Sequence, residues 1–148
     1  VTARRTDAEL LVEMEINSLD DAQVAAQRFA QRGAPAVLLR CGRLKRQHFQ
    51  DDDTAPDFAV DLYYDGAEFG VFEAPYLEQA TGRGASSALS MAILRGMMRE
   101  DDLVETLQSA KLYVTQALRY ARTIGSERRP DYFWPLANES SSSSESHE

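Results

Sequence analysis

The sequence predicts an α/β fold, in which helices lie on the faces of a mainly parallel sheet that also carries a β-hairpin. Three observations support this prediction: an amphipathic helix runs into a short apolar strand, two β-rich segments flank Asp65-Gly66, and a glycine-containing connection opens a helix at Ala85. The 148 residues are typical of one compact domain or of a piece of a larger one. We expect that domain to span 1–138, with a disordered Ser/Glu tail over 139–148.

The first predicted helix follows Ser18. This serine is a suitable N-cap, Asp21 stands at the third helical position, and small or apolar residues recur at helical spacing up to Gly33. The run 36–39 is short and continuously apolar, which is typical of a strand buried on both faces. A helix followed by such a strand indicates an α/β sheet.

A polar segment and a hairpin follow the buried strand. The polar residues of 47–57 show no period and predict a surface loop. The segments 58–64 and 68–72 are rich in β-forming residues, and Asp65 and Gly66 both tolerate a positive φ. The sequence therefore predicts a hairpin beside the buried strand.

Two helices are predicted in the second half of the chain. One covers 85–98, and the other is capped by Asp101 or Asp102 and ends near Gly125. The aromatic, proline-bounded segment 130–136 is expected to pack back on the body of the protein. Three methionines of the first of these helices are expected to fill the core: Met91, Met97 and Met98.

The charge of the chain excludes several classes of partner. With 24 acidic and 16 basic residues the net charge is −8, which repels the phosphates of nucleic acid and of anionic lipid. Apolar runs are far shorter than the roughly 20 residues of a membrane helix. Cys41 alone closes no internal disulfide, and His48 and His147 are too far apart for a metal site. We expect an unexported, cytoplasmic protein that binds neither nucleic acid nor membrane.

The connection before the helix at 85 is the main candidate for a binding site. It reads Thr-Gly-Arg-Gly-Ala-Ser-Ser over 81–87, and the amides at a helix start attract anions together with the helix dipole. Phosphate is therefore a candidate ligand. Small residues at a helix start are usually part of an ordinary cap, and that alternative stays open.

Seven segments, taken in order, resemble one known family. They are 8–11, 18–22, 36–39, 61–66, 72–75, 88–93 and 110–115. Over roughly 1–120 they resemble the C-terminal half of the hydroxymethylpyrimidine/phosphomethylpyrimidine kinases of thiamine synthesis, ribokinase-like relatives of pyridoxal kinase. The resemblance implies a three-layer, ribokinase-like half domain in which ATP lies over this half and its phosphates meet the turn before the helix.

The resemblance also assigns roles to single positions of the turn. In these kinases the turn reads Gly-Thr-Gly-Cys, or ends in Asp, and its last residue helps to activate the substrate hydroxyl. The matching residues are Gly84, Ala85, Ser86 and Ser87. Ser87, the degenerate catalytic position, is neither a carboxylate nor an acidic thiol, and a serine without an adjacent base is a poor proton acceptor. Ser86 adds a Cβ where the family has a glycine.

Other family positions fall on charged residues of this chain. The family's Asn and Glu near the metal and the phosphates match Arg4 and Asp7, and its Lys after the buried strand matches Arg40. The resemblance thus implies ATP and Mg²⁺, with Asp7 reaching Mg²⁺ through water. The guanidinium groups of Arg4, Arg40 and Arg83 are suited to bind phosphate oxygens. Surface ion pairs of the arginines and a helix-dipole role for Asp7 remain the alternatives.

The resulting hypothesis is a phosphomethylpyrimidine kinase-like protein of thiamine biosynthesis ancestry. We expect it to be truncated and catalytically impaired and to retain nucleotide or phosphate binding. One alternative is an active ATP-dependent hydroxymethylpyrimidine or pyridoxal kinase component that needs a partner half, and another is a non-catalytic protein-interaction module. Because Val1 matches a point past the family's midpoint, we expect a separate N-terminal half or a homo-oligomer to cover the exposed strand edge.

Overall fold

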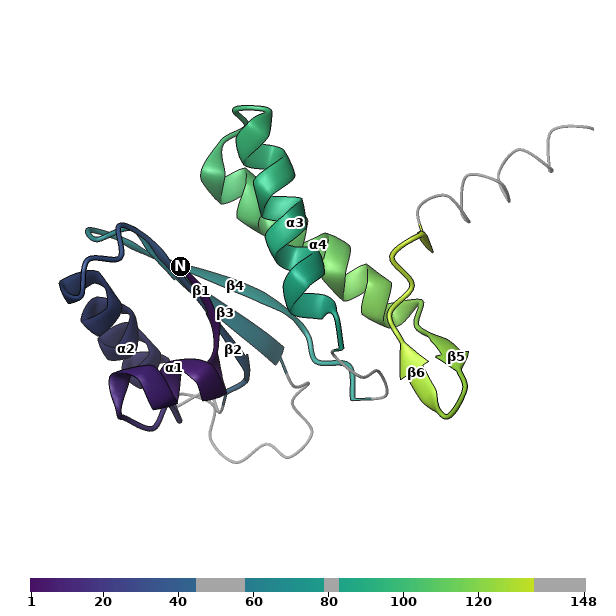
Figure 1. Ribbon diagram of the computed structural model, residues 1–148, viewed down its shortest axis with the longest axis horizontal. Coiled ribbons are helices and arrows are strands. Elements are labelled where there is room, and N and C mark those ends of the chain that lie inside the picture. Colours follow the sequence, from purple (N-terminus) through teal and green to yellow (C-terminus); the bar gives the residue numbers. More distant parts are fainter. Residues whose placement is uncertain (45–57, 79–82, 135–148) are drawn as a thin grey trace, which may run out of the picture. The chain divides into compact units, whose positions relative to one another are not determined.

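The computed structural model describes residues 1–44, 58–78 and 83–134, and its contacts divide the chain into two compact units, Val1–Tyr76 and Leu77–Glu148. Each unit has its own helices and strands (Figure 1). The predicted loop at 47–57 and tail at 139–148 lie outside the described residues, as do His48 and His147. A single half domain over 1–138 stays a prediction.

The first unit contains a four-stranded mixed sheet in the order β1-β2-β3-β4. Its strands are β1 (Thr2–Arg4), β2 (Val37–Arg43), β3 (Phe58–Tyr64) and β4 (Phe69–Pro75). Only β1 and β2 pair in parallel, and the other two pairings are antiparallel. The prediction of a mainly parallel sheet is therefore wrong. The apolar run in β2 reflects burial on both faces, which does not require that its neighbours run parallel to it.

Helices α1 (Arg5–Val12) and α2 (Leu19–Gln31) form the crossover between the two parallel strands. The predicted cap of α2 is confirmed as a capping box. The Ser18 hydroxyl accepts a hydrogen bond from the Asp21 amide at 3.1 Å, and the Asp21 carboxylate accepts one from the Ser18 amide at 3.0 Å. At the other end of α2, Arg28 donates to the carbonyl of Val12 at 2.8 Å and thereby ties the two helices together.

The core of the first unit lies between these two helices and one face of the sheet. Leu39 and Leu62, opposite each other on β2 and β3, are fully buried there. Cys41 is 2% exposed and belongs to the same cluster, as expected of a packed thiol. Because side chains alternate along a strand, Arg40 points to the other face. None of the helices in the described part of the chain is long and apolar enough to cross a membrane.

The β3–β4 hairpin is confirmed, but its turn differs from the prediction. Gly66 has a φ of +99°, whereas Asp65 is not among the described residues with a positive φ. The Asp65 carboxylate instead accepts hydrogen bonds from the amides of Ala67 and Glu68, each at 2.8 Å. Asp65 thus stabilises the turn through its side chain and not through its backbone conformation.

In the second unit α3 (Ala85–Met98) packs on α4 (Leu103–Arg119). The start of α3 is as predicted, and Asp102 caps α4 by accepting a hydrogen bond from the Glu105 amide at 3.0 Å. A Cβ at Gly96 would lie 2.5 Å from the Thr106 side chain. The absence of a side chain at Gly96 therefore lets the two helices approach closely.

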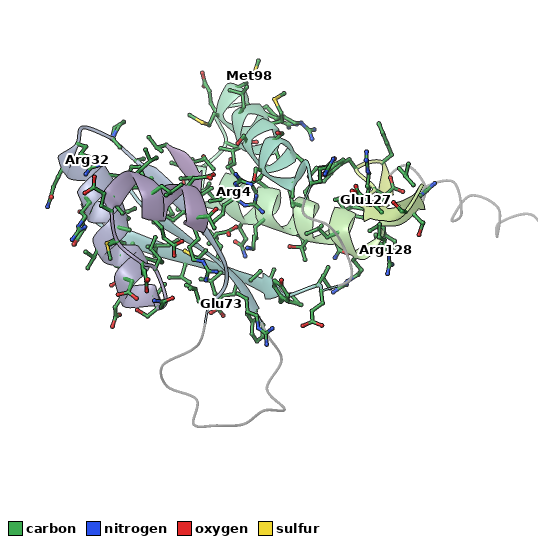
Figure 2. All side chains as sticks on the ribbon, turned by 60° about the horizontal axis from the view of Figure 1, so that its bottom comes forward. Arg4, Arg32, Glu73, Met98, Glu127 and Arg128 are labelled. Atoms are coloured by element: carbon green, nitrogen blue, oxygen red, sulfur yellow. The ribbon has the colours of Figure 1, made fainter. Side chains whose placement is uncertain are left out.

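Two predictions for this unit are wrong. Helix α4 ends at Arg119 and not near Gly125, because β5 (Arg122–Ile124) and β6 (Glu127–Arg129) form a hairpin in which Gly125 has a φ of +65°. The β-branched residues of β5 favour a strand over a longer helix. The methionines of α3 are on the surface, with Met98 at the end of the helix (Figure 2). The exposed fractions are 64% for Met91, 58% for Met97 and 77% for Met98.

Candidate functional site

The predicted phosphate turn forms the N-terminal end of α3. Gly84 is the N-cap, with φ +83° and ψ −13°, and no side chain caps the helix from this position. Its carbonyl accepts the first helical hydrogen bond, from the Ala88 amide at 3.0 Å. The amides of the first turn therefore point out of the helix end, where the helix dipole favours an anion.

The side chains of this turn differ in exposure. Ala85 is 1% exposed, so the whole residue is buried at the first position of the helix. Ser86 is half-buried and Ser87 is exposed. Among the described residues, no hydrogen-bond partner and no general base is seen for the Ser87 hydroxyl. The role of Ser87 at the position that the resemblance makes catalytic stays a prediction.

The structure brings two tyrosines to this turn that the sequence analysis did not assign to it. A Cβ at Gly84 would stand 3.2 Å from the Tyr132 hydroxyl oxygen. The Tyr113 hydroxyl in turn donates a hydrogen bond to the Tyr132 carbonyl at 2.8 Å. Tyr113 lies 29 positions after Gly84 and Tyr132 lies 48 positions after it, so no local sequence pattern links them to the turn.

Charged side chains from the β5–β6 hairpin also reach the turn. Arg83 pairs with Glu127 at 3.7 Å, and Arg129 pairs with the other carboxylate oxygen of Glu127 at 3.3 Å. The Arg83 side chain remains 69% exposed. A bound anion would therefore compete with Glu127 for Arg83.

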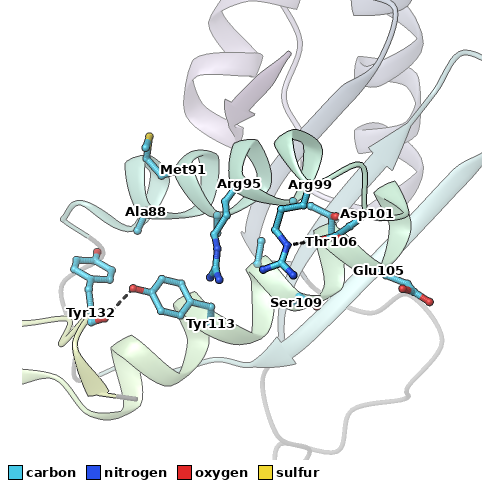
Figure 3. Close-up of a pocket in the computed structure, with 13 residues that line it drawn as sticks. Ala88, Met91, Arg95, Arg99, Asp101, Glu105, Thr106, Ser109, Tyr113 and Tyr132 are labelled. Atoms are coloured by element: carbon cyan, nitrogen blue, oxygen red, sulfur yellow. Dashed lines mark hydrogen bonds and ion pairs between the residues drawn. The ribbon is translucent and has the colours of Figure 1, made fainter. Parts of the chain in front are cut away.

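A groove of about 900 Å³ runs between α3 and α4 next to the turn. Tyr113 and Tyr132 lie at the end where α3 begins, and Arg95 extends from α3 towards α4 (Figure 3). At the far end Arg99 pairs with Asp101 at 3.7 Å. The volume is within the range of small-molecule sites, which is roughly 300–1,000 Å³.

Arg4 and Asp7 belong to the first unit and form an ion pair with each other. Two hydrogen bonds, of 2.8 and 3.0 Å, join the Arg4 guanidinium to the two carboxylate oxygens of Asp7. These bonds lower the pKa of Asp7 and raise the pKa of Arg4. No group of three or more His, Cys, Asp or Glu side chains that could hold a metal occurs among the described residues. The Asp7 carboxylate is thus paired with Arg4, and its role as a Mg²⁺ contact through water stays a prediction.

Arg40 is also in the first unit, whereas Arg83 and the phosphate turn are in the second. On the sheet Arg40 stands between Arg4 of β1 and Asp61 of β3, each its direct cross-strand neighbour. Directly opposite residues share a face of a sheet, so an acidic neighbour lies on the same face as Arg40. A common phosphate site of Arg40 and the turn stays a prediction.

Sequence comparison identifies relatives of the chain. The family model for phosphomethylpyrimidine kinase matches residues 1–131. The hydroxymethylpyrimidine/phosphomethylpyrimidine kinase of Aquifex aeolicus is 34% identical over 125 residues, which are 84% of this chain and 45% of that protein. The thiamine biosynthesis bifunctional protein ThiED of Geobacter sulfurreducens is 32% identical over 130 residues, which are 88% of this chain and 24% of that protein.

Structural comparison supports the same fold. Pyridoxal kinase from Staphylococcus aureus, solved in complex with ADP, superposes with a TM-score of 0.75 at 24% identity. The superposition covers 89% of this chain and 46% of the kinase. The chain thus has an α/β fold that resembles half of a pyridoxal kinase, and it spans less than half the length of these relatives. Because the family model matches residues 1–131 of the 148-residue chain, the chain belongs to the phosphomethylpyrimidine kinase family.

Proposed function

We propose that the chain is the nucleotide-binding half of a phosphomethylpyrimidine kinase-type fold and that it binds the phosphates of an adenine nucleotide at the start of α3. The observation that carries this proposal is the left-handed Gly84 before the uncapped first turn of a 14-residue helix. Backbone amides at such a position are a common phosphate-binding arrangement. The ADP complex of the structurally similar pyridoxal kinase supports a nucleotide as the ligand.

Local charge supports an anion at this turn despite the acidic composition of the chain. The helix start contributes about half a positive charge, and the exposed guanidinium of Arg83 lies directly before it. A guanidinium can hold two phosphate oxygens at once. The adjoining groove, with tyrosine rings at this end, has room for the remainder of a nucleotide.

We further propose that the isolated chain binds the nucleotide without transferring its phosphoryl group. Phosphoryl transfer needs a group that orients or deprotonates the attacking hydroxyl. The resemblance assigns this role to the position of Ser87, where the family has Cys or Asp. The exposed Ser87 has no described base beside it to make it a proton acceptor.

A second candidate function is an active kinase component that works with a partner half. It is favoured by one observation: the chain spans 45% of the Aquifex aeolicus kinase and 46% of the Staphylococcus aureus pyridoxal kinase. A polypeptide corresponding to the remaining half could supply the pyrimidine site and the missing proton acceptor. In that case a hydroxymethylpyrimidine would be phosphorylated only when both halves are present.

Thermal unfolding with added nucleotide, paired with an assay of ADP release, tests the proposal. We expect ATP and ADP to raise the melting temperature, adenosine to leave it nearly unchanged, and the chain with ATP and hydroxymethylpyrimidine to release no ADP. Turnover by the isolated chain would overturn our interpretation of Ser87. An absence of any nucleotide-dependent shift would overturn nucleotide binding.

A pair of glycine variants locates the binding to the turn. Gly84→Ala strains a φ of +83° and places a Cβ 3.2 Å from the Tyr132 hydroxyl, so it should abolish the shift caused by ADP. Gly125→Ala strains a φ of +65° in the same unit but meets no atom within 4 Å, so it serves as the matched control. If Gly84→Ala keeps the full shift, the nucleotide binds elsewhere.

A further inference from the structure

The segment 131–134 is anchored on α4 by its first residue. The Asp131 amide donates a hydrogen bond to the Ala117 carbonyl at 2.9 Å. The Asp131 carboxylate pairs with Arg122 at 2.6 Å, and its side chain is only 9% exposed. A partly desolvated ion pair and a backbone hydrogen bond therefore fix the point at which this segment begins.

Aromatic contacts hold the rest of the segment. The hydrogen bond from the Tyr113 hydroxyl to the Tyr132 carbonyl is 2.8 Å long, and the two rings lie 6.4 Å apart. Trp134 stacks on Tyr120 with a centroid distance of 5.7 Å. Three of the four residues of 131–134 are thus held by residues of α4 or by Tyr120, which directly follows this helix.

The anchored segment places Tyr132 against the first residue of the phosphate turn. A Cβ at Gly84 would lie 3.2 Å from the Tyr132 hydroxyl oxygen and 3.8 Å from the ring carbon Cε2. The Tyr132 ring and its hydroxyl therefore border the backbone of Gly84 directly.

We propose that 131–134 is a positioning segment that holds the turn at Gly84 in the conformation that binds phosphate. The inference rests on the proposed function and adds to it a control of affinity by a segment outside the turn itself. Tyr132 acts as a positioning residue through the backbone of the turn. Amides that are fixed before the ligand arrives lose less conformational entropy on binding than mobile ones do.

Three variants test this role while the turn itself stays unchanged. Tyr132→Leu removes the ring beside Gly84, and Tyr113→Phe removes only the hydroxyl that orients Tyr132. Tyr120→Phe is the matched control, because Tyr120 directly follows α4, is 45% exposed and contributes its ring, which phenylalanine keeps, to the stack with Trp134. Titration calorimetry with ADP and with inorganic tripolyphosphate, below the melting temperature of each variant, gives the dissociation constants.

We expect Tyr132→Leu to raise the dissociation constants of ADP and of tripolyphosphate by the same factor, about ten-fold. Tyr113→Phe should raise both about three-fold. Tyr120→Phe should change neither. An equal loss for both ligands identifies a role at the phosphates, which a general loss of stability would not produce below the melting temperature. Because Tyr113→Phe is a mild change, it keeps the test decisive if Tyr132→Leu folds poorly.

Each other outcome overturns a stated claim. If the unaltered chain binds neither ligand, the proposed function and this inference both fail. If the unaltered chain binds ADP and the variants bind it equally well, only the positioning role fails. A loss of ADP affinity with unchanged tripolyphosphate affinity would show that the segment contacts the nucleoside, which also contradicts a role at the phosphates.

Discussion

The two units of the chain differ in what they bury. The first unit buries Ile16, Leu39 and Leu62 completely between its helices and its sheet. In the second unit the contact between α3 and α4 uses Gly96, while the large side chains of Met97 and Met98 are exposed. The second unit also buries Leu89, Leu107 and Val114 almost completely. In addition, its two helices approach closely at Gly96, and the segment 131–134 adds hydrogen bonds and ring contacts.

The units also differ in charge. Residues 1–76 contain 14 acidic and 8 basic residues, whereas 77–148 contain 10 acidic and 8 basic ones. The proposed phosphate turn thus lies in the unit with the smaller excess of acid. A net charge of −8 for the whole chain is therefore a poor guide to the ligand of one of its parts.

The largest expected effect is a core truncation in the first unit. Leu39→Ala should lower the free energy of unfolding by about 3 kcal/mol, because it leaves a cavity at a fully buried site. Met98→Ala, at a residue that is 77% exposed, should change it by less than about 0.5 kcal/mol. Urea unfolding followed by circular dichroism measures both. A comparable loss for Met98→Ala would show that α3 is covered in solution.

A smaller loss is expected at the contact between α3 and α4. Gly96→Ala places a Cβ 2.5 Å from the Thr106 side chain and should cost about 2 kcal/mol, although alanine favours a helix. Trp134, the only tryptophan, reports on this unit by its fluorescence. The control Ser90→Ala changes an exposed residue of the same helix and should be neutral or slightly stabilising. Equal unfolding transitions for Gly96→Ala and Ser90→Ala would contradict a close approach of α3 and α4 at Gly96.

Lowering the pH should destabilise the first unit. The pKa of Asp21 is lowered chiefly by the hydrogen bond from the Ser18 hydroxyl, and those of Asp7 and Asp65 are lowered as well. A lowered pKa stabilises the fold above the unfolded value of about 4, and this contribution is lost as the pH falls through the folded pKa.

Amide exchange at pH 6 and pH 3, read separately for α2 and α4, measures this difference. Protection in α2 should fall more than protection in α4. Ser18→Ala removes the hydroxyl that lowers the Asp21 pKa and should reduce the pH dependence of α2. An equal loss of protection in both helices would mean that the carboxylates of the first unit do not set its response to acid.

The smallest expected effect is at the ion pair beside the turn. Glu127→Gln should release Arg83 and strengthen ADP binding about two-fold, because exposed ion pairs contribute little. Asp20→Asn makes the same charge change at an exposed residue of the first unit and should leave the affinity unchanged. Weaker binding after Glu127→Gln would show that the hairpin supports the ligand and does not compete with it.

Elements with local signals could be predicted from the sequence. Ser18 and Asp21, the Asp65-Gly66 turn, the start of α3 and the cap at Asp102 follow from side chains only a few positions apart. The direction of the sheet could not be predicted, since burial of β2 on both faces is compatible with either direction. The three-residue strand β1 depends on pairing with residues 36 positions away.

Only the part of the candidate site that has a local sequence signal could be predicted. The turn at Gly84 has a local signature of small residues before a helix. Its contact with Tyr132 depends on the way α4 and the following hairpin return to the start of α3. Exposure of the α3 methionines could not be foreseen either, because an apolar periodicity does not reveal whether a neighbouring element covers it.

The burial of Cys41 gives the first unit a chemical reporter of its own. It is the only cysteine of the chain and is 2% exposed. A thiol reagent in solution can therefore modify it only during transient openings of that core. The labelling rate would give the frequency of these openings. Trp134 emission reports on the second unit in the same sample, so the openings of the two units can be followed independently without added probes.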